Sequence, residues 1–376
     1  MKILFVAFRH SPLDNNSGSG TASQFYKSFC EHGHQVRVIG PFNQSPIIFE
    51  RYLQYLYRKC KRKYIKYKWS TTIRASYMLN KIESTWNPDI IFSLAPSPFV
   101  FYRGTTPYVI RTDTTFLGMN EQAPEYLLHD NLMLQQMVWQ EKKAFSNCAM
   151  IVTHSDWSRK ILRRYYRVKD QFIHVFPNPA SFGFIKNSYQ KQTRVNVLPK
   201  MKRLLIVGRD FKRKGIDIAI DIVNLLNEKG FRSHLKIIGY DGVNGKNHSY
   251  YGNFDKTKYD QYYSYLKFYQ DSEILLHPAR FDASPIVTSE AAAFGIPTIT
   301  NNAGGISTSV KDGISGIVLP RRSASIKYVN AIIKLMSTPK RYFDLCKTTR
   351  LRYEKDLHWG VAGEIMDKIL KECIEY

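Results

Sequence analysis

Two acidic residues, Asp282 and Glu290, stand with seven residues between them in the stretch D-A-S-P-I-V-T-S-E-A-A-A-F-G-I-P. The apolar run 274–276 ahead of them predicts a buried strand of a parallel sheet. A helix should follow, with Ser284 as its N-cap and Pro285 at its first position. Asp282 would then lie at the carboxyl end of a strand, where open α/β sheets bind ligands. The amides at the helix start would favour a phosphate or a sugar oxygen, although the two acids could equally be a surface loop acid and a solvated helix acid.

Two glycine-containing turns carry groups that suit a phosphate. G-R-D-F-K-R-K-G follows an apolar strand, so Gly208 makes the turn, and Arg209 and Lys214 can neutralise a diphosphate. An ordinary basic surface loop is the competing interpretation. Near the start of the chain, S-G-S-G-T places Gly18 and Gly20 at a predicted helix start, where glycine permits close approach of the backbone to a ligand.

The elements that position these residues repeat in two similar halves. Strands are predicted at 3–8, 36–39, 89–94, 108–110, 150–153, 172–175, 204–207, 235–238, 274–276 and 297–300, with helices among them from Ala22, from Ile216 and at 258–269. Strand–helix alternation predicts parallel sheets with helices on both faces. The polar stretch 186–202 is the predicted linker, which gives domains 1–195 and 200–355 and a final segment 356–376.

Length and composition narrow the class of protein. The 376 residues suit two α/β domains, and a hydrophobic content of 44% suits a soluble globular protein. No apolar run approaches the ~20 residues of a membrane span, and the opening M-K-I-L-F-V-A-F-R-H lacks the features of a secretory signal. Five scattered cysteines without metal-ligand spacing fit free thiols in a reducing cytosol. We therefore expect a cytoplasmic protein without a metal site.

The net charge of +24 is partly gathered in two acid-free clusters. Residues 51–74 carry nine Lys and Arg, and residues 159–169 carry six. The first cluster has an apolar stripe at helical spacing and centres on Arg58, Lys59, Lys61, Arg62 and Lys63. It would suit the anionic inner face of a membrane, an acidic acceptor or nucleic acid, or it could be a packed helix with a solvated basic face. Two such clusters in one half of the chain favour a functional role.

Several motifs occur in a specific order along the chain. They are H-G-H-Q-V-R-V-I, R-T-D-T-T-F and T-H-S-D-W-S, then G-R-x4-K-G, the spaced acid pair, A-F-G-I-P, N-A-G-G-I and K-D-G-I-S-G. Together they resemble the family-4 retaining glycosyltransferases of GT-B fold, most strongly from 203 to 320. The resemblance implies an α/β fold of two Rossmann-like doubly wound domains facing a cleft, with a C-terminal helix that returns to the first domain. It also implies transfer of a hexose or pentose from a nucleotide-sugar to a glycan or lipid-linked acceptor.

The resemblance also implies roles for individual residues. Glu290 would hold the ribose hydroxyls and Asp282 would face the transferred sugar, because ionised carboxylates accept such hydrogen bonds well. Arg209 and Lys214 would stabilise the departing diphosphate, so that no metal or other cofactor is expected. The donor site would be completed by Gly18, Ser19, Gly20, Gly252, Phe254, Ser284 and Ile286, with the backbone at 252–254 meeting the base.

The chain departs from the family pattern at a few of these positions. Asp282 stands where Glu is usual, and Pro285 removes an amide that could have touched the donor. Asp113, in R-T-D-T-T-F, stands where many members have a histidine. It is a candidate catalytic residue that could accept a hydrogen bond from the sugar or the acceptor, and equally a turn or cap residue. Two rival classes are another GT-B enzyme, such as a phosphorylase or an epimerase, and a non-catalytic basic protein that binds acidic glycan or nucleic acid.

Overall fold

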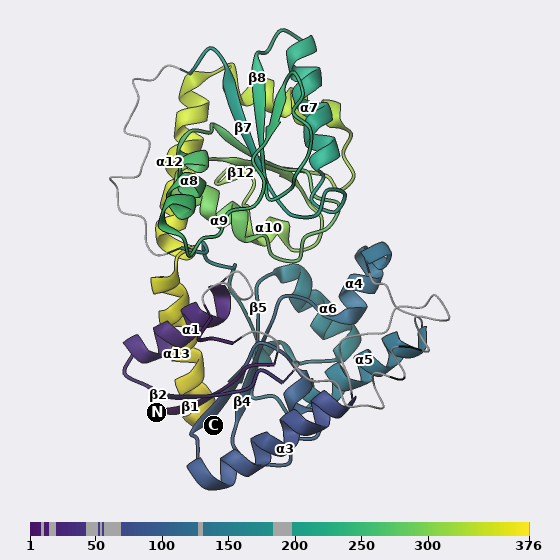
Figure 1. The fold of residues 1–376 in the computed structure, drawn as a ribbon, viewed down its shortest axis with the longest axis vertical. Coiled ribbons are helices and arrows are strands. Elements are labelled where there is room, and N and C mark those ends of the chain that lie inside the picture. Colours follow the sequence, from purple (N-terminus) through teal and green to yellow (C-terminus); the bar gives the residue numbers. More distant parts are fainter. Residues whose placement is uncertain are drawn as a thin grey trace. The chain divides into compact units, whose positions relative to one another are not determined.

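Each half of the chain forms an α/β unit of its own in the computed structural model (Figure 1). The structure describes residues 1–8, 11–14, 20–42, 52, 55, 69–126, 131–182 and 198–375. The first unit comprises Met1–Phe176 together with Gly363–Tyr376, and the second comprises Pro177–Ala362. The prediction of an α/β fold with two Rossmann-like domains is confirmed.

The first unit is built on a six-stranded sheet in the order β2-β1-β3-β4-β5-β6, in which every pair is parallel. Its strands are β1 (Lys2–Val6), β2 (Gln35–Ile39), β3 (Ile90–Ser93), β4 (Tyr108–Thr112), β5 (Met150–Thr153) and β6 (Ile173–Val175). Its α-helices are α1 (Thr21–Glu31), α3 (Trp69–Trp86), α4 (Phe116–Gln122), α5 (Asn131–Phe145) and α6 (Asp156–Tyr166), with short 3-10 turns at Ser97–Phe99, Pro124–Tyr126 and Asp170–Phe172.

Both faces of the sheet are covered at β1, which explains the continuous apolar run of this strand. Leu4 and Val6 pack into the cluster that includes residues of α3. Phe5 points the other way and meets Phe29 of α1 and Phe92 of β3, with ring centroids 6.2 and 5.1 Å apart. A central parallel strand covered by helices on both faces has this uniform hydrophobicity.

The second unit has a six-stranded parallel sheet in the order β12-β11-β10-β7-β8-β9. Its strands are β7 (Lys202–Val207), β8 (Ser233–Ile238), β9 (His248–Tyr250), β10 (Ile274–His277), β11 (Thr298–Asn301) and β12 (Gly316–Leu319). Its helices are α7 (Ile216–Glu228), α8 (Tyr259–Gln270), α9 (Ile286–Ala293), α10 (Ile306–Ser309), α11 (Ser325–Met336) and α12 (Pro339–Asp356).

The strand order of the second unit determines which loops meet. Because β10 pairs with β7, the turn after β7 and the loop after β10 leave the sheet at the same edge. The predicted cations of the first loop and the predicted acid of the second are therefore neighbours in space, although about 70 residues separate them in the chain.

The structure differs from the predicted boundaries in three places. Residues 177–182 pack with the second unit, where Ala180 and Phe182 join its core, so this unit begins before the predicted linker. Strands β9 and β12 were not predicted, because they are short and only half-buried and so lack a marked apolar pattern. Pro285, not Ser284, is the N-cap of α9, and its backbone is extended at φ −71° and ψ 114°.

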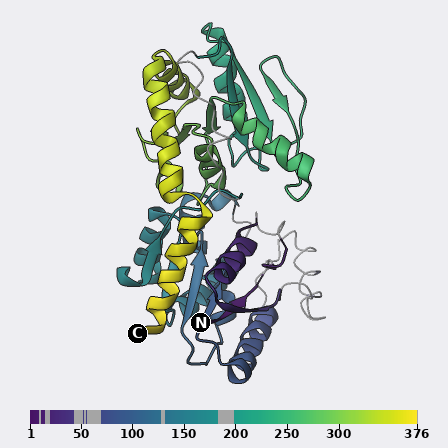
Figure 2. The same ribbon diagram turned by 90° about the vertical axis from the view of Figure 1, so that its left-hand side faces the viewer.

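The last helix, α13 (Trp359–Glu375), lies along the first unit over its C-terminal part (Figure 2). Met366, Ile369 and Leu370 are buried at helical spacing. Asp367 Oδ1 lies 2.6 Å from Nε2 of His34, beside β2. Closest to α1, Gly363 has no room for a side chain, because a Cβ there would lie 2.2 Å from the Oγ of Ser28.

We predict that Gly363→Ala lowers the free energy of unfolding by roughly 1–2 kcal/mol, because overpacking outweighs the better helix propensity of alanine. Ser28→Ala should relieve the clash, since the remaining Ser28 contact, at its Cβ, is 3.4 Å away. A double-mutant cycle by denaturant unfolding checks this. Strictly additive effects of the two substitutions would show that the helices do not touch there.

Candidate functional site

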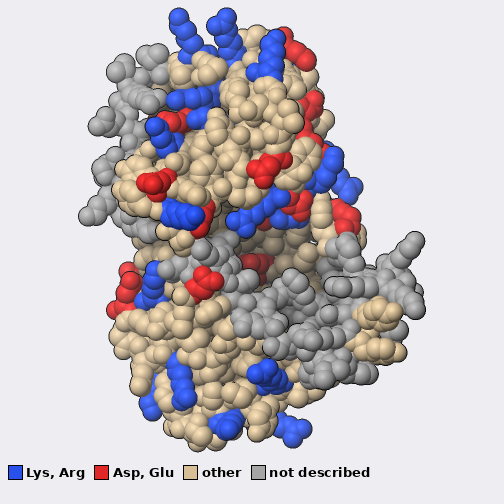
Figure 3. All heavy atoms as spheres, in the orientation of Figure 1, with Lys and Arg blue, Asp and Glu red and all other residues tan. Residues whose placement is uncertain are grey.

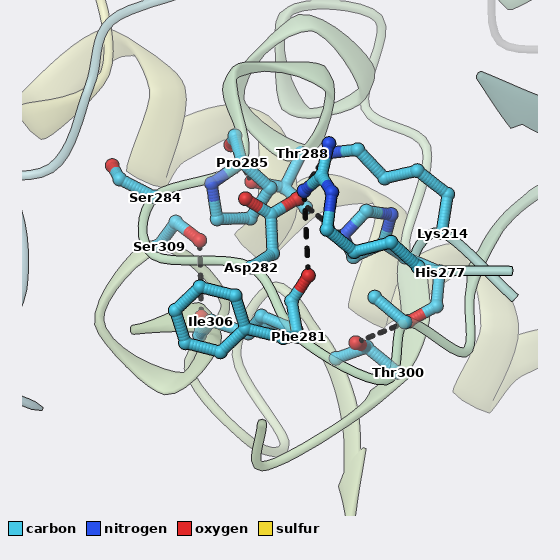
Figure 4. Close-up of polar contacts among 12 residues, drawn as sticks. Lys214, His277, Phe281, Asp282, Ser284, Pro285, Thr288, Thr300, Ile306 and Ser309 are labelled. Carbon is cyan, nitrogen blue, oxygen red and sulfur yellow. Dashed lines mark hydrogen bonds and ion pairs between the residues drawn. The ribbon is translucent and has the colours of Figure 1, made fainter. Parts of the chain in front are cut away.

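The carboxylate of Asp282 lies at the carboxyl edge of the second sheet, just beyond β10 (Figure 4). The Nζ of Lys214 pairs with Asp282 Oδ2, and Nε2 of His277 lies 3.0 Å from the same oxygen. The side chains of His277 and Asp282 are only 0% and 9% exposed. Asp282 Oδ1 carries no hydrogen bond from the described part of the chain. One carboxylate oxygen is therefore fixed, and the other is available to a ligand.

The protonation states of this cluster follow from its surroundings. Burial alone would raise the pKa of Asp282, but the Lys214 ammonium and the hydrogen bond from His277 hold it well below its usual range. Burial lowers the pKa of His277, although Asp282 partly opposes this shift. At neutral pH, His277 is therefore a neutral imidazole that donates its Nε2–H to an ionised carboxylate.

The turn from Gly208 to Gly215 brings Lys214 onto this carboxylate. Gly215 has φ 73°, and a Cβ there would lie 2.2 Å from the carbonyl oxygen of Pro278. Only glycine permits this close approach of the turn to the loop after β10. The Lys214 stem lies across Gly208, whose added Cβ would come within 2.6 Å of it.

The cations of this turn differ in how they are paired. Lys212 binds Asp217 at 2.8 Å and Arg213 binds Asp210 at 3.2 Å, so both are structural partners. Arg209 is exposed and makes no hydrogen bond or ion pair with the residues that the structure describes. Its guanidinium is the cation of the turn that is best placed to receive an added anion.

Glu290, on α9, is enclosed by hydrogen-bond donors. Lys256 Nζ lies 2.9 Å from Oε1, which also accepts the Ser181 hydroxyl. Tyr265 and Tyr269 donate to Oε2 at 2.5 and 2.6 Å. Burial would raise the pKa of Glu290, but Lys256 and these hydroxyls together lower it. The Glu290 carboxylate is 1% exposed and Lys256 is 34% exposed, so the ammonium is the part of this cluster that a ligand can displace.

The start of α9 is held by the segment that enters the second unit. Asn178 Nδ2 donates to Ser284 Oγ at 2.9 Å, and Ser289 Oγ donates to the Asn178 carbonyl at 2.6 Å. This use of its hydroxyl explains why Ser284 does not cap the helix. No side chain caps α9, whose first residue is Ile286, so its first amides are not taken up by a capping side chain.

The predicted base-binding loop follows β9. Gly252 has φ 66°, and its carbonyl accepts the Gly239 amide at 2.7 Å. The ring of Phe254 packs against Tyr265 and Phe268, with ring centroids 6.3 and 5.4 Å away. The hydrogen bond from Gly239 therefore ties this loop to the end of β8. Its Phe254 ring packs the loop against α8, the helix whose tyrosines bind Glu290.

The first unit brings its own charged group to the end of β4. Asp113, 45% exposed, lies 2.8 Å from Nη2 of Arg111. Arg111 Nε donates to Nε2 of the fully buried His154, whose Nδ1–H donates to the Phe176 carbonyl at 2.7 Å. Burial and the nearby Arg111 lower the pKa of His154 well below its usual value, so it is neutral. Arg111 on β4 therefore holds the candidate Asp113 in place. Arg111 is itself held by His154 after β5, which is fixed by the Phe176 carbonyl after β6.

Some predicted residues cannot be placed. Gly18, Ser19 and the basic residues Arg58, Lys59, Lys61, Arg62 and Lys63 lie outside the described residues. Gly20 is described, and it is the N-cap of α1 with φ 77°.

On the face drawn in Figure 3, acidic and basic side chains intermingle over the second unit.

The described residues offer neither a metal site nor a membrane-spanning helix. No group of His, Cys, Asp or Glu there has an arrangement that could hold a metal ion. None of the helices in these ranges is both long and apolar enough to cross a bilayer.

The sequence reasoning missed the residues that hold the acids in place. His277 ends a strand five residues before Asp282, a spacing that could have suggested a contact. Lys256 and Arg111 reach their partners only through strand order and loop packing. No local pattern signals them.

Two family models match the chain, one in each half. Residues 188–352 match the model described as Glycosyl transferases group 1, and residues 21–181 match Glycosyltransferase Family 4. The family resemblance drawn from the motifs is confirmed, whereas retention of the anomeric configuration stays a prediction.

Two curated relatives match parts of the chain. An uncharacterized 41.2 kDa protein in the cps region of Klebsiella pneumoniae is 25% identical over 160 residues, 41% of each chain. The lipopolysaccharide glucosyltransferase WaaG of Escherichia coli K12 is 27% identical over 159 residues, 39% of this chain and 40% of that one. The chain thus spans about two fifths of the length of these relatives.

Solved structures share the fold over nearly the whole chain. Sucrose-phosphate synthase from Thermosynechococcus elongatus has a TM-score of 0.74 at 15% identity, with 99% of this chain and 98% of that chain covered. HepE of Anabaena in complex with UDP-glucose has a TM-score of 0.62 at 12% identity, with 99% and 100% covered.

We predict that His277→Phe destabilises the protein by about 1–3 kcal/mol at pH 7, because Asp282 loses a buried donor. The penalty should shrink as the pH falls from 7 to 3.5. Below about 6.5, the unfolded wild type binds a proton at His277 that the buried native imidazole excludes, whereas the variant has no such group to protonate. Urea unfolding across this pH range measures the effect.

Thr300→Val is the matched control for this prediction. Its hydroxyl donates to the His277 carbonyl at 2.7 Å but has no titrating partner, so the cost of the control should not change with pH. If the penalty for His277→Phe also stayed constant from pH 7 to 3.5, the assigned protonation states would be wrong.

Proposed function

Because the chain belongs to the family-4 glycosyltransferases of GT-B fold, we propose that it transfers a hexose or pentose from a nucleotide-sugar to a glycan or lipid-linked acceptor. The observation that carries this proposal is the Asp282 carboxylate, buried at the carboxyl edge of the second sheet with Oδ2 bound and Oδ1 free. Such an oxygen accepts one sugar hydroxyl without further rearrangement.

The diphosphate of the donor would bind at the turn after β7. Exposed Arg209 supplies a guanidinium with no partner among the described residues, and Arg can grip phosphate with two parallel hydrogen bonds. Lys214 lies between the proposed sugar and diphosphate positions, because its Nζ already holds Asp282. Donors aimed at the leaving diphosphate lower the barrier by roughly 3 kcal/mol each in comparable sites.

The nucleoside would bind on the α8–α9 side of the same edge. We propose that the ribose hydroxyls replace Lys256 on Glu290 Oε1, while the two tyrosines keep Oε2 fixed. The backbone around Gly252 would meet the base. The uncapped start of α9, at Ser284–Ile286, would face the diphosphate or the sugar. Gly18, Ser19 and Gly20 of the first unit complete the proposed donor set.

The proposed reaction retains the anomeric configuration and uses no metal or other cofactor. Arg209 and Lys214 would provide the positive charge that a divalent cation provides in other transferases. Asp282 has its charge compensated by Lys214, so it would orient the sugar rather than attack it. Asp113, braced by Arg111, would accept a hydrogen bond from the sugar or the acceptor.

The acceptor is proposed to meet the first unit. The basic segment 51–74 would place that unit against the anionic inner face of a membrane, where each cation contributes about 1 kcal/mol. The proposed location is therefore cytoplasmic and peripheral. Nucleic acid is not a proposed partner.

We predict that Arg209→Gln weakens binding of both UDP and UDP-glucose by at least about tenfold, because a charged hydrogen bond is worth roughly 1.5–3 kcal/mol. The melting temperature without ligand should not change, since Arg209 has no described partner to lose. The rise in melting temperature with the concentration of UDP or UDP-glucose measures these affinities. The same titration is repeated with GDP, ADP and their sugar derivatives.

Arg232→Gln is the control, because it removes another exposed arginine of the same unit, directly before β8. It should bind as wild type does. Binding of every nucleotide by Arg209→Gln with wild-type affinity would remove the turn after β7 from the donor site.

We also predict full activity in EDTA and a product with the donor's anomeric configuration. The measurement is product formation, followed by NMR of the anomeric proton, with each compatible donor and acceptor pair. Activity lost in EDTA and restored by one divalent metal would contradict the proposed charge role of Arg209 and Lys214. An inverted product would contradict retention.

A further inference from the structure

A basic hollow lies at the end of α6 in the first unit. It measures about 890 Å³, within the roughly 300–1,000 Å³ of small-molecule sites. We call it the α6 hollow and define it by its charged lining residues: Lys160, Arg163, Arg164, Arg167, Lys169 and Asp170. Its five cations are all exposed.

The spacing of these cations gathers them on one side of the helix. Lys160, Arg163, Arg164 and the cap residue Arg167 follow one another at i, i+3, i+4 and i+7, so they share one face. Like charges at these spacings repel and destabilise a helix. Folding alone therefore gives no reason for this arrangement.

Internal ion pairs do not neutralise the hollow. Its one acid, Asp170, is held by Arg159 through two contacts, the Nε bond being 2.8 Å long, and Arg163 is 3.5 Å away. Arg164 reaches Glu121 only at 3.7 Å. Lys160, Arg167 and Lys169 have no acidic partner among the described residues. The hollow keeps an excess of positive charge.

The helix dipole explains only part of this charge. Arg163 and Arg164 lie in the last turn, where cations are favoured. Lys160 precedes that turn, and Lys169 follows the helix. Arg167, the C-cap, adopts φ 56°, a left-handed conformation that glycine adopts more readily. An arginine held there brings a long cationic side chain to the hollow at a conformational cost.

We propose that the α6 hollow binds a multiply charged, phosphate-bearing anion. Three arginines can each grip phosphate oxygens with paired hydrogen bonds, and the lysines add point charges. A single charge would gain little from exposed cations, so the anion carries several. Among its described lining residues only Val168 is apolar. Charged side chains gathered in this way suit a phosphate chain or a phosphate-bearing head group.

This site is separate from the proposed donor site. The donor diphosphate is assigned to Arg209 and Lys214 of the second unit, whereas the α6 hollow belongs wholly to the first. It would hold a phosphate-bearing acceptor or another polyanion on the unit proposed to bind the acceptor.

The test is titration calorimetry of the full chain with inorganic tripolyphosphate at low and high salt. The variant Lys160→Gln/Arg167→Gln/Lys169→Gln removes cations that have no described ion pair, so the fold should not suffer. It should weaken binding by at least about tenfold and reduce its salt dependence. The control Lys81→Gln/Lys142→Gln/Lys143→Gln removes three other exposed cations of the first unit and should bind as wild type does.

Two further measurements distinguish the competing sites. Arg209→Gln should leave tripolyphosphate binding at the hollow unchanged, and loss of that binding in this variant would place the anion in the second unit and overturn the proposal. Equal affinities of the hollow variant and the control variant would also overturn it. So would flotation with phosphatidylglycerol vesicles that the hollow variant loses and the control variant keeps, if the wild type binds no tripolyphosphate, since the surface would then be a membrane contact.

Discussion

The second unit depends on keeping one buried carboxylate charged. Removing a charge from water costs several kcal/mol unless partners replace the lost hydration, and Asp282 has two such partners, Lys214 and His277. Lys214 can reach it only because the preceding turn closes onto the loop after β10. That closure requires a glycine at 215, where a side chain would strike the Pro278 carbonyl. Strand order, turn geometry and the chemistry of the site are thus one constraint.

The two sheets hold a charged side chain at their carboxyl edges in similar ways. In each, a buried neutral histidine at the end of a strand fixes a charged neighbour: His277 binds Asp282 directly, and His154 accepts from Arg111, which pairs with Asp113. The imidazole supplies one directional hydrogen bond without adding a second buried charge. Both aspartates stand at the carboxyl edge of a parallel sheet, where rigid strands hold polar groups for a ligand.

Much of this architecture could be predicted from the sequence, because it rests on local patterns. Apolar runs gave nearly every strand, and glycine turns gave the edge at which Arg209 and Lys214 lie. The contacts around the acids could not be predicted in this way. Lys256 finds Glu290 through packing of α8 against α9, and Arg111 finds His154 through strand neighbours. The apolar pattern also does not predict strands β9 and β12, because short, half-buried strands have little hydrophobic periodicity.

In the proposed donor site, the free Oδ1 of Asp282 binds a hydroxyl of the transferred sugar. The most direct measurement compares wild type with Asp282→Asn in calorimetric affinity for a nucleotide-sugar and for its nucleoside diphosphate. Because the substitution keeps the size of the side chain, we expect a loss of affinity for the sugar-bearing ligand that clearly exceeds the loss for the diphosphate. Equal losses for the two ligands, or no loss for either, would show that Asp282 does not face the sugar.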